Sequence, residues 1–339
     1  MEIGETHKVI HSFVHELWGM FMHKMTGIAS VNRVFIVGCG DIGIRVALLE
    51  QAAGRQVIAL ARSETSTHRL AQHGIEPVAG DLDHPGSLLE LPSTEVVYYF
   101  APPPSESDGD PRLASLLAAL DKNSLPRKLV YISTSGVYGD CGGEWVDEDW
   151  PMNPRSDRAR RRAAAENRLL EWSRLRGADA VILRVPGIYG PGRLPVERIR
   201  RGVPVVREDE SPWSNRIHAD DLAQACVLAA LRGRAGGVYN VSDGNPTTMT
   251  DYFFRVADLL GLPRPPSISM EDARLTLGPG ILSFLEESKR LDNRRMLEEL
   301  GVELRYPMLD CGLPACLVQP ADSPLSGSVR QSAAGHRGG

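Results

Sequence analysis

The sequence has no long apolar run and few cysteines. No uninterrupted hydrophobic stretch approaches the roughly 18 residues of a membrane-spanning helix, so the sequence predicts no membrane partner. The five cysteines are odd in number and form no C-x-x-C pair, which is typical of reduced thiols and not of a disulfide framework. They are Cys39, Cys141, Cys226, Cys311 and Cys316. We therefore predict a cytoplasmic protein.

The chain also lacks a positive net charge. Its 38 Lys and Arg against 43 Asp and Glu give a formal charge of −5 at pH 7, which argues against bulk attraction to nucleic acid or anionic membranes. One basic cluster exists, "PRSDRARRRAAAENR" (154–168), with six arginines in fifteen positions. Because no aromatic residue or known motif lies among them, we predict a single helix with water-facing arginines and no nucleic-acid partner.

What the sequence does contain is an alternation of apolar strands and helices. "VNRVFIVGCGDIGIRVALLEQAAG" predicts a buried strand, a glycine turn and a helix, and further strands are predicted by "QVIALAR", "EVVYYFAPP", "KLVYISTS" and "AVILRVPGIYG". Continuous apolar strands are typical of a parallel sheet covered on both faces. The predicted fold is α/β, a Rossmann-like doubly wound parallel sheet with a smaller C-terminal substrate lobe.

The first turn carries the pattern G-x-G-x-x-G between strand and helix. Gly38 permits the tight turn, Gly40 lets the backbone approach a pyrophosphate, and Gly43 allows helix and strand to pack closely. The helix start at Asp41 and Ile42 would present free N–H groups to the phosphates. The pattern favours a dinucleotide site, and the alternative is a plain tight turn.

Two further positions bear on the cofactor. Arg62 and Ser63 follow the second strand, where an acidic residue would hold the ribose of NAD. A guanidinium suits a 2′-phosphate, so the sequence favours NADP, with NAD as the alternative; Arg62 could also be an exposed strand-end cation. Asp81 could accept the adenine amino group or simply form a turn.

The remaining organisation follows from these patterns. Residues 31–190 are predicted to form the NAD(P)-binding domain, and 191–310 the smaller lobe, with 216–245 returning to the sheet. Helices are expected near 219–232, 248–261 and 283–300.

The two ends are interpreted separately. Residues 1–30 are read as a helical or disordered extension, or as upstream sequence before a later start codon, and 320–339 as a disordered tail. His7, His11 and His15 are spaced to share one helix face; we interpret it as polar and predict no metal site.

In several blocks the chain resembles the extended short-chain dehydrogenase/reductase superfamily, the NAD(P)-dependent epimerase/dehydratase proteins. The similarity runs from about Arg33 to about Pro307. It rests on the glycine turn, "GDLDHPGSL", "KLVYISTSGVYGD", "LRVPGIYGPGR", "NRIHADDLAQACVLA", "GGVYNVSDGNPTT" and "SKRLDNRRMLEELG".

The resemblance implies roles for individual residues. Thr134 would be the catalytic hydroxyl, Ala101 and Pro102 would lie beside the cofactor, and the nicotinamide would be bordered by Pro186, Gly187 and Ile188. The substrate side would include Tyr138, Arg193 and His218. For "HADD" (218–221) a helix cap with a bracing network is the alternative.

One departure from the superfamily is decisive for the mechanism. Its hydride chemistry uses a Tyr-x-x-x-Lys pair, yet no tyrosine lies between 139 and 188 and no lysine follows a tyrosine by four positions. When Glu166 is aligned with the glutamate that follows this motif, Arg158 and Arg162 occupy the two positions. The chain therefore resembles an atypical branch that lacks the pair.

Two functions remain open. The first is an NADP-dependent oxidoreductase or epimerase with a substitute acid, for which Tyr138, Asp140, Glu144, His218 and a bound water are candidates; the second is an inactive NADP(H) sensor. The predicted partner is a small-molecule substrate, and a homodimer stays open. Arginines of the lobe favour an anionic or sugar-nucleotide-like substrate, or are solvated surface charge; they are Arg193, Arg198, Arg200, Arg201 and Arg207.

Overall fold

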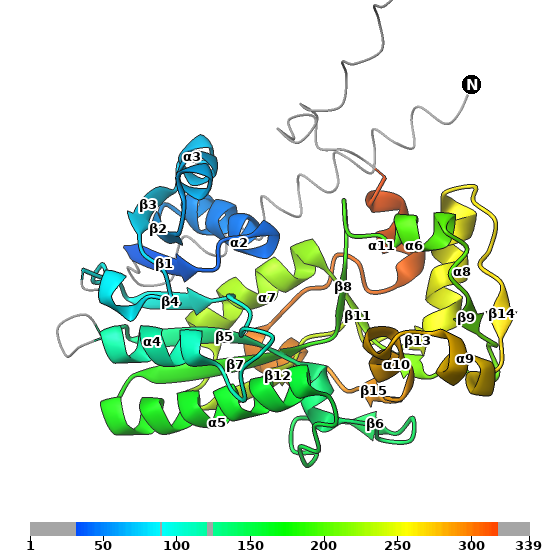
Figure 1. The fold of residues 1–339 in the computed structure, drawn as a ribbon. Coiled ribbons are helices and arrows are strands. Elements are labelled where there is room, and N and C mark those ends of the chain that lie inside the picture. Colours follow the sequence, from blue (N-terminus) through cyan, green and yellow to red (C-terminus); the bar gives the residue numbers. More distant parts are fainter. Residues whose placement is uncertain (1–31, 89, 121–124, 318–339) are drawn as a thin grey trace, which may run out of the picture.

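The computed structural model describes residues 32–88, 90–120 and 125–317. A parallel sheet of seven strands forms its centre (Figure 1). In spatial order the strands are β12 (Gly237–Asn240), β7 (Asp179–Val185), β5 (Lys128–Thr134), β4 (Val96–Tyr99), β1 (Arg33–Val37), β2 (Gln56–Ala61) and β3 (Glu76–Ala79). The strand order reverses between β1 and β4, which confirms the predicted doubly wound, Rossmann-like α/β fold.

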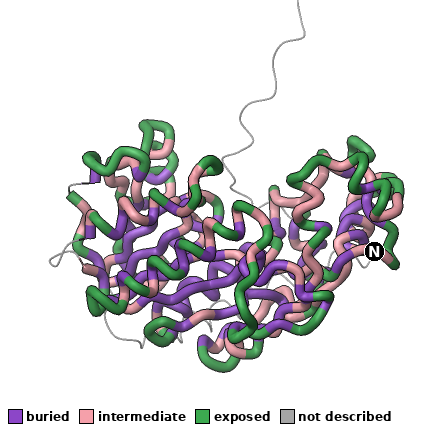
Figure 2. The backbone as a smooth tube through the Cα atoms, turned by 60° about the horizontal axis from the view of Figure 1, so that its bottom comes forward, coloured by how far each residue is buried: buried purple, intermediate pink, exposed green. Residues whose placement is uncertain are grey.

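Helices cover both faces of this sheet, which explains why its strands are apolar along their whole length. One face carries α2 (Asp41–Ala52), α3 (Glu64–Gln72) and α7 (Ala219–Arg232), and the other carries α4 (Pro111–Ala119) and α5 (Asp157–Arg176). Residues 34–37 of β1 are fully buried, and Figure 2 shows the central strands as buried. Burial on both faces requires side chains such as Val, Ile and Phe at every position instead of an alternating pattern.

The segment 216–245 contributes to this core from the far side of the sequence. In it α7 packs against α2, and β12 pairs in parallel with β7 from Gly237 opposite Val181 to Asn240 opposite Arg184. The chain therefore leaves the sheet after β7 and returns to it before the rest of the lobe begins.

The C-terminal lobe consists of short elements. Its helices are α6 (Val196–Arg200), α8 (Met249–Leu259), α9 (Met270–Thr276), α10 (Pro279–Leu285) and α11 (Leu309–Ala315). Its small strand pairs, two of which include strands from the first domain, are β8 (Gly187–Tyr189) with β11 (Arg216–His218), β9 (Val205–Val206) with β14 (Ser267–Ile268), β10 (Trp213–Ser214) with β13 (Thr247–Thr248), and β6 (Trp145–Val146) with β15 (Arg290–Leu291).

Two predictions of local structure are wrong. The single helix expected near 283–300 is α10, then β15, then a π-helix at Met296–Leu300, because Arg290 and Leu291 pair with the distant strand β6. The single strand expected at 180–190 is β7 and β8, separated at Pro186, which has no N–H for a ladder.

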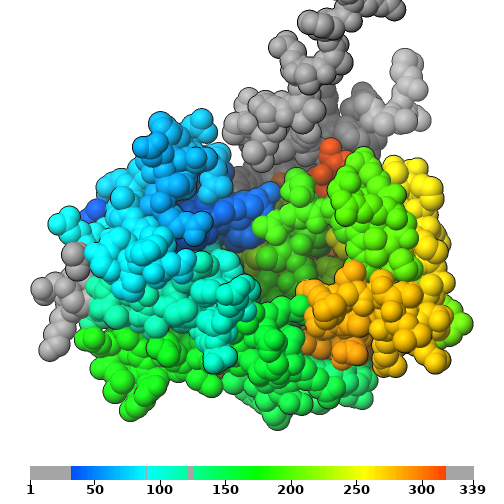
Figure 3. Space-filling model, viewed as in Figure 1, coloured from blue at the N-terminus to red at the C-terminus, as the bar shows by residue number. Residues whose placement is uncertain are grey.

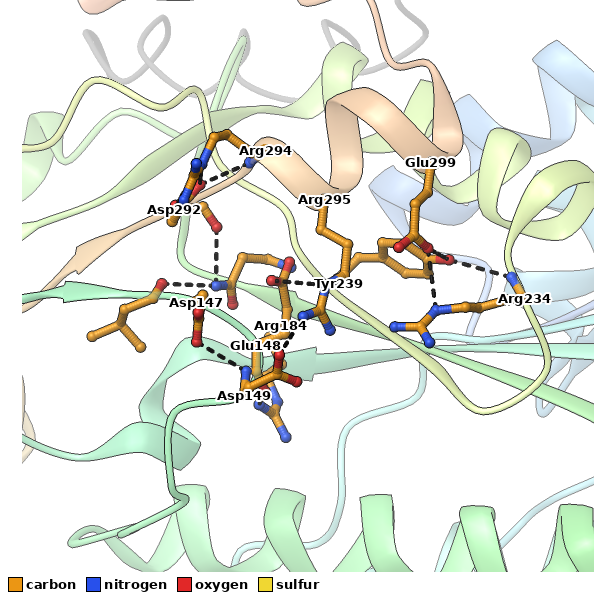
Figure 4. Close-up of polar contacts among 12 residues, drawn as sticks. Asp147, Glu148, Asp149, Arg184, Arg234, Tyr239, Asp292, Arg294, Arg295 and Glu299 are labelled. Carbon is orange, nitrogen blue, oxygen red and sulfur yellow. Dashed lines mark hydrogen bonds and ion pairs between the residues drawn. The ribbon is translucent and has the colours of Figure 1, made fainter.

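A polar network joins the loop after β5 to the lobe (Figure 4). Arg184 Nη1 donates to the carbonyl oxygen of Glu148 at 3.2 Å, and Arg295 Nε lies 3.4 Å from Glu148 Oε2. Glu148 Oε1 also accepts the backbone N–H of Asn240 at 2.8 Å. These contacts fix the loop that precedes α5, and with it the start of the arginine-rich helix.

Candidate functional site

The predicted site residues follow the carboxyl ends of five adjacent strands. Arg62 follows β2, Gly38 follows β1, and Ala101 lies two residues beyond β4. Thr134 ends β5, and Pro186 follows β7. Because neighbouring strands lie about 4.8 Å apart, these positions form one row about 19 Å long. Ligands of open α/β sheets bind along this edge.

Beside the glycine turn lies a cavity of about 480 Å³, here termed the glycine-turn cavity. Predicted cofactor residues line it, namely Gly38, Gly40, Arg62, Ser63, Asp81, Ala101 and Pro102. The sequence pattern gives no signal for Ser66, Arg69 and Arg112, which line it as well. Figure 3 shows a hollow between the N-terminal part, coloured blue and cyan, and the yellow and orange lobe.

The three glycines of the turn are required for different reasons. Gly38 has φ +88°, and a Cβ there would lie 2.4 Å from the backbone nitrogen of Ala101. A Cβ on Gly43 would lie 3.3 Å from the carbonyl oxygen of Gly38, so helix and strand are in close contact there. A Cβ on Gly40 would meet no atom within 4 Å, so the protein itself does not demand glycine at this position.

The first turn of α2 is linked to the lobe by charge. Asp41 Oδ1 lies 3.0 Å from Arg45 Nε, and Asp41 Oδ2 lies 2.5 Å from Arg193 Nε. Ile42 is buried in the core, so only its backbone is available to a ligand. The Asp41–Arg193 bridge neutralises a carboxylate at the helix start, where a phosphate would otherwise be repelled.

In the same cavity, the Arg62 side chain is largely exposed and could meet a ligand. Its side chain is 67% exposed, and the nearest carboxylate oxygen, Asp83 Oδ2, is 3.9 Å away. Asp83 is itself held by Arg112, with Nε and Nη2 at 2.7 and 2.6 Å. Ser63 caps α3, since its Oγ accepts the N–H of Ser66 at 3.3 Å.

Asp81 is engaged in its own turn. Its Oδ1 accepts the N–H of Asp83 at 3.0 Å, and its Oδ2 lies 3.0 Å from His84 Nδ1. These contacts are the ones expected if Asp81 forms a turn. Asp81 also lines the glycine-turn cavity.

A second cavity of about 330 Å³ lies at the ends of β5 and β7, here termed the arginine cavity. Residues predicted for the catalytic and nicotinamide region line it, namely Thr134, Arg158, Pro186, Gly187, Ile188 and Arg193. Thr134 Oγ1 accepts the N–H of Gly136 at 3.2 Å, which leaves the hydroxyl proton available to a ligand.

Three arginines of this cavity have no carboxylate within 4 Å in the described part of the chain. They lie over aromatic rings, with Arg158 Cζ 3.6 Å from the Phe284 centroid, Arg198 4.4 Å from Phe253, and Arg216 4.3 Å from Tyr252. Burial lowers the pKa of all three guanidinium groups.

Hydrogen bonds hold two of these arginines in place. Arg158 Nη1 donates to Ser283 Oγ at 3.0 Å, and Arg216 Nη1 to the carbonyl oxygen of Asn215 at 2.8 Å. The sequence pattern missed Arg216, which lies opposite the predicted residue Gly187 in the parallel pairing of β11 with β8.

The two residues at the Tyr and Lys positions lie in different surroundings. Arg158 lines the arginine cavity, whereas Arg162 Nη1 donates to the carbonyl oxygen of Ile132 and the hydroxyl of Tyr131, both at 3.0 Å. Arg162 thus stabilises the end of β5 and is not among the residues that line the arginine cavity.

The structure places the proposed substitute acids outside the arginine cavity. Tyr138 is fully buried and donates its hydroxyl to Asn240 Oδ1 at 2.7 Å, because the 3-10 turn at Ser135–Tyr138 directs it inward. Asp140 accepts the N–H of Ser288 at 3.0 Å. Glu144 is exposed.

His218 lies outside the cavity too and braces the lobe. Its Nδ1 accepts the N–H of Asp220 at 3.2 Å, and its ring packs on Tyr189 and Tyr306. Burial lowers the pKa of His218 to about 4, so the ring is neutral at pH 7. Asp221 accepts the N–H groups of 305 and 306, both at 2.9 Å.

Neither metal nor membrane features are found in the described ranges. No group of three or more His, Cys, Asp or Glu side chains there is arranged to hold a metal ion. No helix of these ranges is both long and apolar enough to cross a bilayer. His7, His11 and His15, like the segments 1–30 and 320–339, lie outside the described residues.

Comparisons with known proteins agree with this geometry. Residues 34–242 match the model of the NAD dependent epimerase/dehydratase family. Protein YeeZ of Escherichia coli (strain K12) is 27% identical over 82% of this chain and 97% of its own. A conserved protein of unknown function from Silicibacter pomeroyi is 33% identical, with a TM-score of 0.72 over 84% of this chain and 98% of its own. The fold is also that of Bacillus anthracis dTDP-glucose 4,6-dehydratase in complex with NAD, at 20% identity and a TM-score of 0.67 over 84% of this chain and 95% of that one.

Proposed function

Since the chain belongs to the NAD dependent epimerase/dehydratase family, we propose that it binds NADP along the carboxyl edge of its sheet and oxidises, reduces or epimerises a small anionic substrate in the arginine cavity. When bound, the nicotinamide ring would accept or supply a hydride. A non-standard mechanism is required, because no Tyr-x-x-x-Lys pair exists in the sequence.

The residues present fit a dinucleotide. Gly40 leaves open the space that a Cβ would fill, and it stands at the N-terminus of α2, where N–H groups point toward a phosphate. Ala101 and Pro102 line the same glycine-turn cavity at the end of β4. The proposed nicotinamide position is beside Thr134, Pro186 and Gly187 in the arginine cavity.

The preference for NADP rests on Arg62. Its exposed guanidinium lies in the glycine-turn cavity with Ser63, and no acidic residue stands directly after β2 to hold a ribose 2′-hydroxyl. A phosphate between Arg62 and Ser63 would gain a charge-assisted hydrogen bond from the guanidinium.

Arg62→Asp is expected to weaken NADPH binding about 10- to 100-fold and NADH binding much less. One charge-assisted hydrogen bond is worth roughly 1.5–3 kcal/mol, and each 1.4 kcal/mol is tenfold. Fluorescence titration with both cofactors measures the ratio. Arg168→Asp, an exposed position on α5, is the control for net charge. An unchanged NADPH-to-NADH ratio in Arg62→Asp would refute the NADP assignment.

The anionic substrate is supported by one observation above the others. Arg158, Arg198 and Arg216 line one cavity, and none has a carboxylate within 4 Å among the described residues. All three are half-buried and lack a counter-ion among the described residues, so a ligand that brings phosphate or carboxylate groups would supply the missing negative charge. Nucleotide sugars are one such class, since the structurally similar dTDP-glucose 4,6-dehydratase is named for one.

Arg198→Ala and Arg216→Ala are each expected to weaken binding of UDP-glucose, or of inorganic pyrophosphate, at least tenfold. The loss of one charged hydrogen-bond donor to a phosphate accounts for this size. Isothermal titration calorimetry measures it, with Arg201→Ala at an exposed position of the same lobe as the control. Equal losses in all three variants would contradict the site. NADPH binding with no anion binding in the wild-type protein would favour the sensor alternative.

A further inference from the structure

Oxidation of an alcohol or reduction of a carbonyl needs a group that takes up or delivers a proton. Arg158, at the position of the superfamily's tyrosine, cannot do so, because a guanidinium does not lose its proton in a protein. The candidates proposed from the sequence lie outside the arginine cavity. The acid of this site must therefore be sought among the residues that line it.

In the described part of the chain, Glu287 is the one carboxylate that lines the arginine cavity. Thr134 and the Pro186–Ile188 segment assigned to the nicotinamide line the same cavity. Its side chain is 9% exposed, and its Oε2 lies 3.0 Å from Lys289 Nζ. Glu287 Oε1 is buried and has no hydrogen-bond partner among the described residues.

An unsatisfied buried carboxylate oxygen is unusual and costs free energy unless a ligand supplies a donor. A substrate hydroxyl in the cavity is such a donor. Lys289 holds the carboxylate in place, since it is 6% exposed and its Nζ also donates to the carbonyl oxygen of Gly139 at 2.6 Å.

The backbone around Glu287 is fixed by distant segments. Ser288 accepts the N–H of Cys141 at 3.0 Å, and Lys289 donates its N–H to the carbonyl oxygen of Trp213 at 3.4 Å. The next residue, Arg290, begins strand β15, which pairs with β6 and places Arg290 opposite Trp145. The carboxylate is thus carried by an anchored segment, as a preorganised catalytic group requires.

We propose that Glu287 is the catalytic acid and base of this site, with Lys289 as its positioning residue. The Glu287 carboxylate would take the proton of the substrate hydroxyl. The oxidised nicotinamide, when bound, would accept the hydride from the carbon that bears this oxygen, and that carbon would become a carbonyl. In the reverse direction, protonated Glu287 returns that proton to the oxygen as the carbonyl is reduced. The Thr134 hydroxyl donates to the same substrate oxygen.

Titratable groups on three packed segments lie near Glu287. Lys289 is on its own segment, Arg158 comes from α5, and Asp140 and Cys141 come from the loop after β5. A dianion bound by the arginines of the cavity brings negative charge next to Glu287, so its binding is expected to be accompanied by uptake of a proton there.

This inference rests on the proposed anion site, and one experiment separates the two. Inorganic sulfate is the probe, because it carries two charges and does not titrate near neutral pH. Calorimetric titrations between pH 5 and 7, in buffers of different ionisation enthalpy, give the number of protons taken up per sulfate bound. We expect uptake in the wild-type protein, none in Glu287→Gln with sulfate affinity equal or higher, and wild-type uptake in Glu286→Gln, an exposed neighbour.

The outcomes are distinct. If the wild-type protein binds no sulfate, the anion site fails, and the role of Glu287 falls with it. If sulfate binds but the wild-type protein takes up no proton, or Glu287→Gln keeps the uptake, the anion site stands and Glu287 is not the proton carrier. Glu287→Asp, which keeps the carboxylate, should restore uptake and so excludes a loss caused by misfolding.

Discussion

Gly40→Ala is expected to weaken NADPH binding at least tenfold while the melting temperature stays close to that of the wild type. The added Cβ meets no protein atom within 4 Å, but it enters the glycine-turn cavity at the N-terminus of α2. A dinucleotide phosphate would have to withdraw from the N–H groups there, and a loss of 1.4 kcal/mol is already tenfold. The cost to the helix cap is at most about 1 kcal/mol.

Gly38→Ala is the matched comparison, and in this variant the stability of the fold is expected to fall. Its Cβ would lie 2.4 Å from the backbone nitrogen of Ala101, and φ is +88°. The left-handed conformation costs roughly 1–2 kcal/mol and overpacking against a fixed strand end roughly 1–3 kcal/mol, so stability should fall by about 2–5 kcal/mol. Thermal and urea unfolding measure this. Wild-type NADPH affinity in Gly40→Ala would show that the phosphate does not approach this turn.

Arg184→Met is expected to destabilise the protein by about 3–5 kcal/mol. Arg184 Nη2 lies 2.9 Å from Glu166 Oε2, and the two side chains are 6% and 1% exposed. Removal of the guanidinium leaves the carboxylate buried without its counter-charge, which is more costly than the loss of the pair as a whole. Arg184 also donates to the Glu148 carbonyl, so the loop before α5 loses an anchor (Figure 4).

The double variant Glu166→Gln with Arg184→Met provides the control. The amide keeps an acceptor for the Ser133 hydroxyl, which bonds to Glu166, and no charge is left unpaired. Its free energy of unfolding, from urea titration, should therefore lie above that of Arg184→Met. A single variant that loses less than about 1 kcal/mol would contradict a buried, coupled pair.

The parts of this fold that the sequence predicts are those whose signals are local. The apolar strand 33–37 and the turn at Gly38 and Gly40 are contiguous in the chain, so the sheet and the strand-to-helix turn follow from pattern alone. The predicted helix at 283–300 is wrong because Arg290 and Leu291 find a strand partner more than 140 residues away, at Trp145 and Val146. Helical spacing carries no information about such a partner.

In the candidate site, too, the sequence predicts the residues of a local pattern and misses those whose role depends on packing. A family pattern points to Thr134, but nothing in "LEES" distinguishes Glu287 from its neighbour Glu286, and only the packing of its segment makes one buried and the other exposed. The arginines of 154–168 likewise look alike in sequence. In the fold Arg158 lines the arginine cavity, Arg160 pairs with Asp157, and Arg162 bonds to the end of β5.

The Asp41–Arg193 bridge has a consequence for how two ligands would influence each other. Arg193 belongs to the wall of the arginine cavity, yet its guanidinium is held by the first residue of α2, beside the glycine turn. A phosphate at the helix start and an anion in the arginine cavity would therefore compete with Asp41 for the same side chain. Occupancy of either cavity would then change the affinity of the other by the same factor in both directions. A single arginine would thus couple the binding of cofactor and substrate across the two lobes.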